Sequence, residues 1–178
     1  MIKFKLIVSG LALSGVIAAC NQSANNGNIL NQDSTANTVS VSPEIKDGDT
    51  KQVYKHYIYL KDVLVESNAS EAQTVAKELA LALIKIEGCE NTAALATKIV
   101  NTSDIKEQRF NFTALSSDII ALVKHTEITS GSMYVQYCPM ANEGKGGYWL
   151  ASETEIRNPY YGDEMLNCGE VKDTIEKK

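Results

Sequence analysis

Residues 105–124, with the sequence IKEQRFNFTALSSDIIALVK, contain the clearest helical pattern in the chain. One face of this pattern repeats at alternating steps of three and four positions and consists of Ile105, Gln108, Phe112, Leu115, Ile119 and Leu122. Such spacing is typical of an amphipathic helix with one buried side. Ser103 or Asp104 lies directly before the segment and can serve as its N-cap.

Three further helical patterns precede this one. The first has an apolar face made of Val53, Tyr57, Leu60 and Leu64. The second begins with a capping box, in which Ser70 is the N-cap and Gln73 its partner, and ends before Gly88. The third is shorter and can have Asn91 as its N-cap. Four helices joined by short polar segments usually pack as antiparallel neighbours, so the sequence predicts an all-α fold, an antiparallel four-helix bundle.

The character of the chain changes after the fourth helix, and residues 128–178 are expected to form an irregular lobe rich in Cys, Met and aromatic residues. We predict a short extended segment at 133–138, a flexible loop at 142–147 and a last helical turn over 170–176. A solvated charge run is expected at Glu153, Glu155 and Arg157. The aromatic residues form either the small core of the lobe or a recognition surface, and they are Tyr148, Trp149, Tyr160 and Tyr161.

The first twenty residues, MIKFKLIVSGLALSGVIAAC, have the pattern of an export signal. Two lysines precede fourteen apolar or small residues, which are too few to span a bilayer of about 30 Å. The segment ends in Ile-Ala-Ala-Cys, which resembles the lipobox of bacterial lipoproteins and implies a signal peptide at 1–19 and acylation of Cys20. Residues 20–52 are rich in Asn, Ser, Thr and Asp and are predicted to be a flexible tether to the membrane.

Length and charge limit the function classes. The chain has 178 residues, 44% of them hydrophobic, and a net charge of −5. That length favours a single domain, which we place at 53–178. The acidic charge is diffuse, which argues against nucleic-acid binding because phosphate backbones require clustered Lys and Arg. The sequence has no glycine-rich phosphate loop, HExxH or GxSxG motif, so we expect neither nucleotide binding nor enzymatic activity.

Sulfur-bearing residues form two close pairs, Cys138 with Met140 and Met165 with Cys168. Thiolate and thioether sulfur selects soft metal ions such as Cu(I). In an oxidising compartment, a disulfide between Cys138 and Cys168 is an equally weighted alternative. Cys89 is expected to be a packed small residue, and His125 a surface residue rather than a third ligand.

Several stretches resemble a periplasmic family, the domain-of-unknown-function 3347 family, which also occurs in Bacteroidetes-type lipoproteins. They are YLKDVLVESNASEAQ (59–73), DIKEQRFNFTALSSDIIALVK (104–124), MYVQYCPMA (133–141, which differs from the family pattern at its first residue) and EIRNPYYGDEMLNCGEV (155–171). The same domain is similar to an appendage of CusB-type heavy-metal efflux adaptors. This resemblance implies copper or silver handling, with Cys138, Met140, Met165 and Cys168 as the metal ligands.

We therefore expect a lipoprotein that binds Cu(I) through a Cys/Met site. Its anchor at Cys20 would hold it to the outer membrane, facing the periplasm, because no acidic residue follows Cys20 to suggest retention at the inner membrane. A heavy-metal efflux component is the expected partner. The alternative is a disulfide-stapled, non-enzymatic protein-interaction module of the cell envelope.

Overall fold

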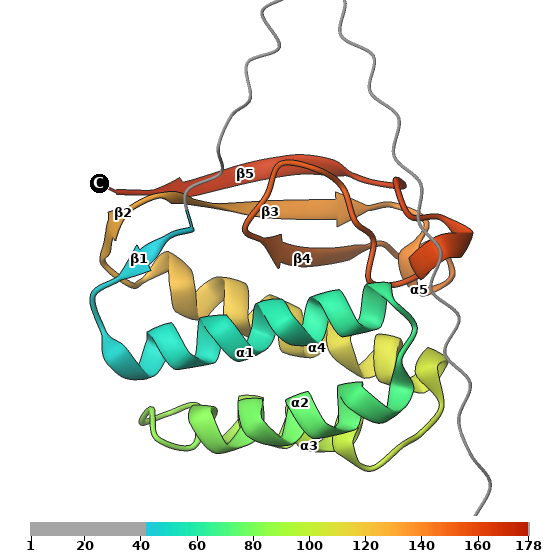
Figure 1. The fold of residues 1–178 in the computed structure, drawn as a ribbon, viewed down its shortest axis with the longest axis horizontal. Helices are drawn as coiled ribbons and strands as arrows, with labels where there is room; N and C mark the ends of the chain where they lie inside the picture. The colour runs from blue at the N-terminus through green and yellow to red at the C-terminus, as the bar shows by residue number, and fades with distance from the viewer. Residues whose placement is uncertain (1–41, 178) are drawn as a thin grey trace, which may run out of the picture. The chain divides into compact units, whose positions relative to one another are not determined.

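The computed structural model of the protein describes residues 42–177 (Figure 1). Its elements are, in chain order, β1 (Glu44–Ile45), α1 (Gly48–Val65), α2 (Ala69–Leu83), α3 (Glu90–Val100), α4 (Ile105–Lys124), β2 (Ile128–Ser130), β3 (Ser132–Cys138), α5 (Ala141–Gly144), β4 (Gly147–Ala151), the 3-10 turn η1 (Gly162–Glu164) and β5 (Glu170–Glu176). The predicted signal peptide, Cys20 and the first part of the tether lie outside the described residues.

The four predicted helices are present and packed together (Figure 1). The apolar face predicted for α1 is fully buried, as are Phe112, Leu115 and Ile119 of α4. Asp104 is the N-cap of α4, and its side chain accepts a hydrogen bond of 2.8 Å from the backbone N–H of Lys106. The periodic pattern therefore identified which faces pack inward.

The first residues of α1 and α2 differ from the prediction. Helix α1 begins at Gly48 with Asp47 as its N-cap, so the last part of the predicted tether is already folded. Helix α2 is capped by Asn68, whose side chain accepts from the backbone N–H of Glu71, instead of by Ser70. Asn is as favourable an N-cap as Ser, and Asn68 caps the helix two residues earlier than predicted.

The all-α fold class was wrong, because the C-terminal part is a small antiparallel sheet and the fold is mixed α/β. Strands β4, β3 and β5 pair in that order, while β1 and β2 form a separate two-stranded ladder. The extended segment predicted at 133–138 is confirmed as β3. In contrast, residues 170–176 form strand β5 and not a helical turn, because they pair along β3, with Met133 opposite Ile175.

Strand β4 is the edge of the sheet that lies nearest to α1 and α4 (Figure 1). Two tyrosine hydroxyls satisfy backbone groups of β4: the N–H of Leu150 donates to Tyr57 at 3.0 Å, and Tyr160 donates to the carbonyl of Tyr148 at 2.7 Å. Unpaired edge groups are costly when buried. The tyrosines thus join the sheet edge to the rest of the molecule.

A chain of aromatic rings makes the core continuous between helices and sheet. Tyr57 stacks on Phe112 with ring centroids 5.4 Å apart, and Tyr160 follows at 5.8 Å from Phe112 and 6.0 Å from Trp149. Trp149 and Tyr160 are buried. They are therefore core residues, and of the four aromatics considered for a recognition surface only Tyr148 is largely exposed.

Candidate functional site

Cys138 and Cys168 are brought together by the fold of the lobe. Cys138 is the last residue of β3 and is buried, while Cys168 lies in the loop before β5 and is partly exposed. Their Sγ atoms are 2.9 Å apart, and both residues are free thiols in this structure. The sequence offered a pairing of Cys138 with Cys168 as one of two alternatives, and the fold places their two Sγ atoms in contact.

Asn158 holds the loop that carries Cys168. This buried side chain donates to the carbonyl of Cys168 at 2.8 Å and accepts from the backbone N–H of Tyr160 at 2.8 Å. Its own backbone N–H donates to the carbonyl of Leu166 at 2.8 Å. A buried amide with these partners fixes the loop conformation. Sequence reasoning missed this role, although an Asn directly before a Pro is a turn signal.

The two methionines contact Cys168 with their backbone atoms. The backbone of Met140 hydrogen-bonds the sulfur of Cys168, and the N–H of Cys168 donates to the carbonyl of Met165 at 3.0 Å. The side chain of Met140 is 51% exposed, and Met165 is half-buried. All four predicted sulfur residues therefore lie in one neighbourhood, with Met140 facing largely into solvent.

The environment of Cys168 favours its protonated form. The hydrogen bond with Cys138, burial and the neighbouring Cys138 charge raise the pKa of the Cys168 thiol above its ordinary value, and the Met140 backbone acts in the opposite sense. Metal binding requires thiolates. Any metal at this pair would have to displace protons first.

Other candidate ligands lie elsewhere. His125 is the C-cap of α4, His56 contacts Glu78 with 3.4 Å between Nδ1 and Oε2, and Cys89 is the N-cap of α3. Within residues 42–177, no group of three or more His, Cys, Asp and Glu side chains is arranged to hold a metal ion. Within the same residues, no helix has the length and apolar character needed to cross a membrane.

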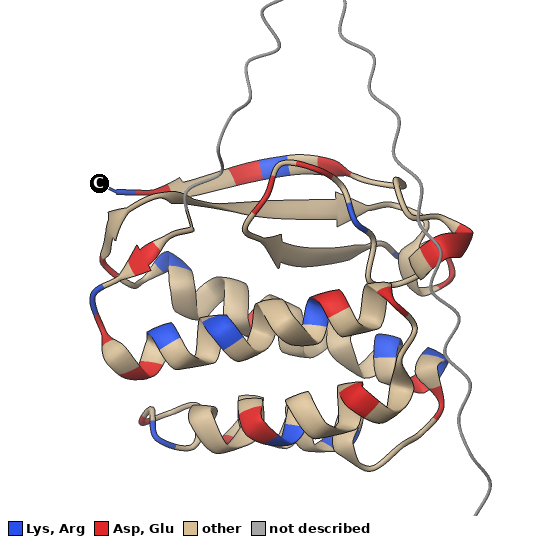
Figure 2. Ribbon diagram, viewed as in Figure 1, with Lys and Arg blue, Asp and Glu red and all other residues tan. Residues whose placement is uncertain are grey.

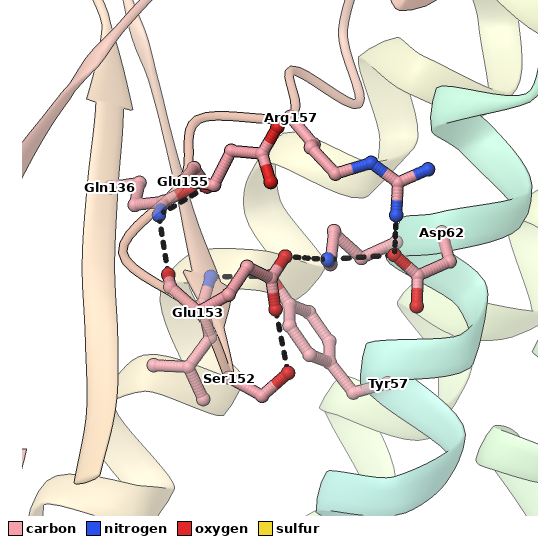
Figure 3. Close-up of polar contacts among 9 residues, drawn as sticks. Tyr57, Asp62, Gln136, Ser152, Glu153, Glu155 and Arg157 are labelled. Carbon is pink, nitrogen blue, oxygen red and sulfur yellow. Dashed lines mark hydrogen bonds and ion pairs between the residues drawn. The ribbon is translucent and has the colours of Figure 1, made fainter. Parts of the chain in front are cut away.

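A second polar cluster lies where α1 meets the segment after β4 (Figure 3). Lys61, whose side chain is 1% exposed, contacts Glu153 at 2.6 Å and Asp62 at 2.7 Å. Arg157 reaches Asp62 at 3.5 Å. The prediction of a solvated charge run at Glu153, Glu155 and Arg157 was therefore wrong for Glu153, which is half-buried and paired with Lys61.

The charge of Lys61 controls the ionisation of Glu153. Burial alone would raise the pKa of Glu153, but the Lys61 charge and hydrogen bond, with Ser152 and Arg157, outweigh burial and lower the pKa below its ordinary value. Glu153 is therefore a carboxylate at neutral pH. A fully paired cluster of this kind serves structure, because its charged groups are occupied with each other.

Comparison with known proteins identifies one family. Residues 53–131 match the model of a family described as "Protein of unknown function (DUF3347)", which confirms the resemblance over the helical part. The match ends before Cys138, so the sulfur residues lie beyond it. Neither any curated protein nor any solved structure matches the chain.

Proposed function

We propose that this chain, which carries a DUF3347 domain at residues 53–131, is a non-enzymatic protein-interaction module of the cell envelope, stapled by a Cys138–Cys168 disulfide. The observation that carries this proposal is the 2.9 Å contact between the two Sγ atoms. A metal ion needs more room, because two thiolates that share one tetrahedral Zn(II), each at about 2.3 Å, are separated by roughly 3.8 Å. A disulfide needs the sulfurs to approach each other, to about 2.05 Å.

The disulfide forms by exchange with an oxidised partner of the export compartment. The two thiols lose two protons and two electrons, the Sγ–Sγ bond forms, and the partner's disulfide is reduced to two thiols. The new bond closes a loop of 30 residues, for which the chain-entropy model gives a stabilisation of about 3 to 4 kcal/mol. Such a staple suits a lobe that is held mainly by long-range strand pairing.

Cu(I) binding by the reduced pair is the second candidate. The observation in its favour is that the backbones of Met140 and Met165 both contact Cys168, which places two methionine residues beside the two thiols. Soft sulfur ligands favour Cu(I). The sulfurs would have to separate from their present contact to admit the ion.

Location and partners complete the proposal. Acylation of Cys20 would anchor the module to the outer membrane, facing the periplasm, with more than one acyl chain needed for a stable anchor. In the copper-binding case, a heavy-metal efflux component is the partner that the family resemblance implies.

One experiment separates the two candidates. The purified chain is divided into an oxidised and a prereduced sample, and free thiols are counted by mass after alkylation. Each sample then competes anaerobically with a chromophoric chelator for Cu(I), beside the Cys138→Ser/Cys168→Ser variant. The staple predicts that the oxidised chain loses two alkylatable thiols, which protease mapping assigns to Cys138 and Cys168, and that neither sample withdraws Cu(I).

Two results would decide otherwise. One equivalent of Cu(I) held by the reduced chain and lost in the double variant would establish the copper site. Cys138 and Cys168 both remaining alkylatable after purification under oxidising conditions would contradict the staple. Cys89, which lies at the start of α3, is the internal control, because it is expected to be alkylated in every sample.

A further inference from the structure

A cavity of about 570 Å³ lies away from the thiol pair, and none of the four sulfur residues lines it. Its wall is built from four segments: the turn between α1 and α2, the first two turns of α4, turn α5 and residues 160–164. Pockets that hold small molecules have volumes of about 300 to 1,000 Å³. The cavity is therefore large enough for a compact organic ligand.

Arg109 is the best-fixed cation of this cavity. It is only 9% exposed, and its Nε donates to the carbonyl of Pro159 at 2.9 Å. Its Nη2 donates to the carbonyl of Leu64 at 2.9 Å and to Oγ of Ser67 at 2.8 Å. These three bonds use every donor of Nε and Nη2. Nη1 makes no hydrogen bond or ion pair with the described residues, so its two N–H groups are available to a ligand in the cavity that Arg109 lines.

Two lysines and two glutamates complete the charges of the wall. Lys106 and Lys145 line the cavity, and within residues 42–177 neither forms an ion pair. Glu143 and Glu164 line it as well, so with Arg109 the cations exceed the carboxylates by one. A single negative charge on a ligand would balance this wall.

The remaining surface of the cavity is apolar and aromatic. Phe110 is 67% exposed and lines the cavity. Ile105, Tyr160 and Tyr161 also contribute to the wall. A ligand with a ring or apolar body would cover Phe110 and gain from removing it from water.

The backbone around the cavity is held in rare conformations. Ser67, Asn142 and Glu143 have φ values of 59°, 53° and 59°, and they are the non-glycine residues with positive φ among the described residues. All three line this cavity. Left-handed backbone at non-glycine residues gathers at ligand sites, where the surrounding structure enforces it.

We infer that this cavity binds an aromatic monocarboxylate, whose carboxylate contacts Arg109, Lys106 and Lys145 and whose ring packs on Phe110. The inference is independent of the thiol pair. A charge excess of one favours a monocarboxylate over inorganic phosphate, and the exposed phenyl ring favours a ligand with an apolar body.

The test uses three probes on the full chain in isothermal titration calorimetry. They are 4-hydroxyphenylacetate, tyramine, which carries the same ring with an ammonium group, and inorganic phosphate. We expect 4-hydroxyphenylacetate alone to bind. The Lys106→Gln/Lys145→Gln variant should weaken its binding at least tenfold, whereas Lys77→Gln, on the exposed face of α2, should leave it unchanged.

Arg109→Lys and Phe110→Ala test the two halves of the ligand separately. We expect each to weaken binding of 4-hydroxyphenylacetate by tenfold or more, and circular dichroism reports whether the Arg109 variant folds. If it does not fold, the double lysine variant and Phe110→Ala still decide. Equal binding of tyramine, phosphate binding as tight as that of the carboxylate, no binding at 5 mM, or wild-type affinity in the lysine variant would each overturn the inference.

Discussion

Lys61 is a charged side chain that is almost completely removed from water, and its position is explained by its partners. It contacts Glu153 and Asp62 at 2.6 and 2.7 Å, and it connects α1 to the segment after β4. Breaking one side of a buried pair leaves the other charge uncompensated, which costs more than the pair itself contributes. The cluster therefore affects the stability of the fold mainly when one of its members is removed.

We expect Lys61→Met to lower the free energy of unfolding by about 2 to 4 kcal/mol, because Glu153 would be left half-buried without its cation. Urea unfolding monitored by circular dichroism measures the change. The matched control is Lys51→Met, which removes an exposed ion pair with Glu44 and should cost less than about 1 kcal/mol. Similar losses in both variants would contradict a special role for Lys61.

The lowered pKa of Glu153 has a consequence for acid stability. Its folded-state pKa lies below the ordinary value of 4.5, so its pairing stabilises the protein above about pH 4.5. That stabilisation is lost as pH falls through the folded-state pKa. We expect Glu153→Gln to flatten the fall in stability between pH 5 and the acid limit, as measured by thermal unfolding at several pH values. A wild-type pH profile in the variant would contradict this.

At the scale of elements, the edge of β4 depends on a hydroxyl group of α1. Tyr57 accepts from the N–H of Leu150 and also hydrogen-bonds Ser116 of α4, so its hydroxyl connects three elements at one atom. Burial raises the pKa of Tyr57 itself far above its ordinary value, so the group stays neutral. Its oxygen is available as an acceptor at any physiological pH.

Tyr57→Phe should lower the free energy of unfolding by about 1 to 3 kcal/mol, because two buried polar groups lose their partner. Tyr54 provides the control, since its buried hydroxyl has no hydrogen-bond partner among the described residues. Tyr54→Phe should be neutral or slightly stabilising. Chemical denaturation of both variants tests the pair, and equal destabilisation would show that the rings and not the hydroxyls matter.

The helices were predictable from the sequence, and most of the sheet was not. Helical faces depend on residues three and four apart, so the pattern at 105–124 contains the information locally. Strand β5 instead depends on pairing with β3, whose residues lie more than thirty positions earlier. Its side chains are mostly exposed and charged, so no alternating apolar pattern predicts the strand (Figure 2).

The same distinction applies to the candidate site. Cys138, Met140, Met165 and Cys168 could be selected from their chemistry, and the structure brings their backbones together. The cavity lined by Arg109 could not be predicted from the sequence, because its wall combines residues that lie far apart in the chain, from 67 to 164. Lys61 carries no local signal, and the turn signal at Asn158 does not show that its side chain is buried, since the fold alone buries both residues.

At the scale of the whole molecule, the C-terminal part is held to the helices by Tyr57, Lys61 and the aromatic core, and within it the Sγ atoms of Cys138 and Cys168 lie in contact. We expect reduction of an oxidised sample to lower its thermal midpoint by about 10 °C or more, from the loop-closure stabilisation of about 3 to 4 kcal/mol. Differential scanning calorimetry with and without reductant measures this. The Cys138→Ser/Cys168→Ser variant should show no effect of reductant.

The short ladder between β1 and β2 has a mechanical consequence. Glu44 and Ile45 pair with Ser130 and Ile128, and Lys46 contacts Glu127 at 2.7 Å. A lipid anchor at Cys20 would transmit any tension on the tether to this point before it reached α1. The ladder has few bonds to rupture, so under load it would yield first and lengthen the tether by several residues while the packed helices stay intact.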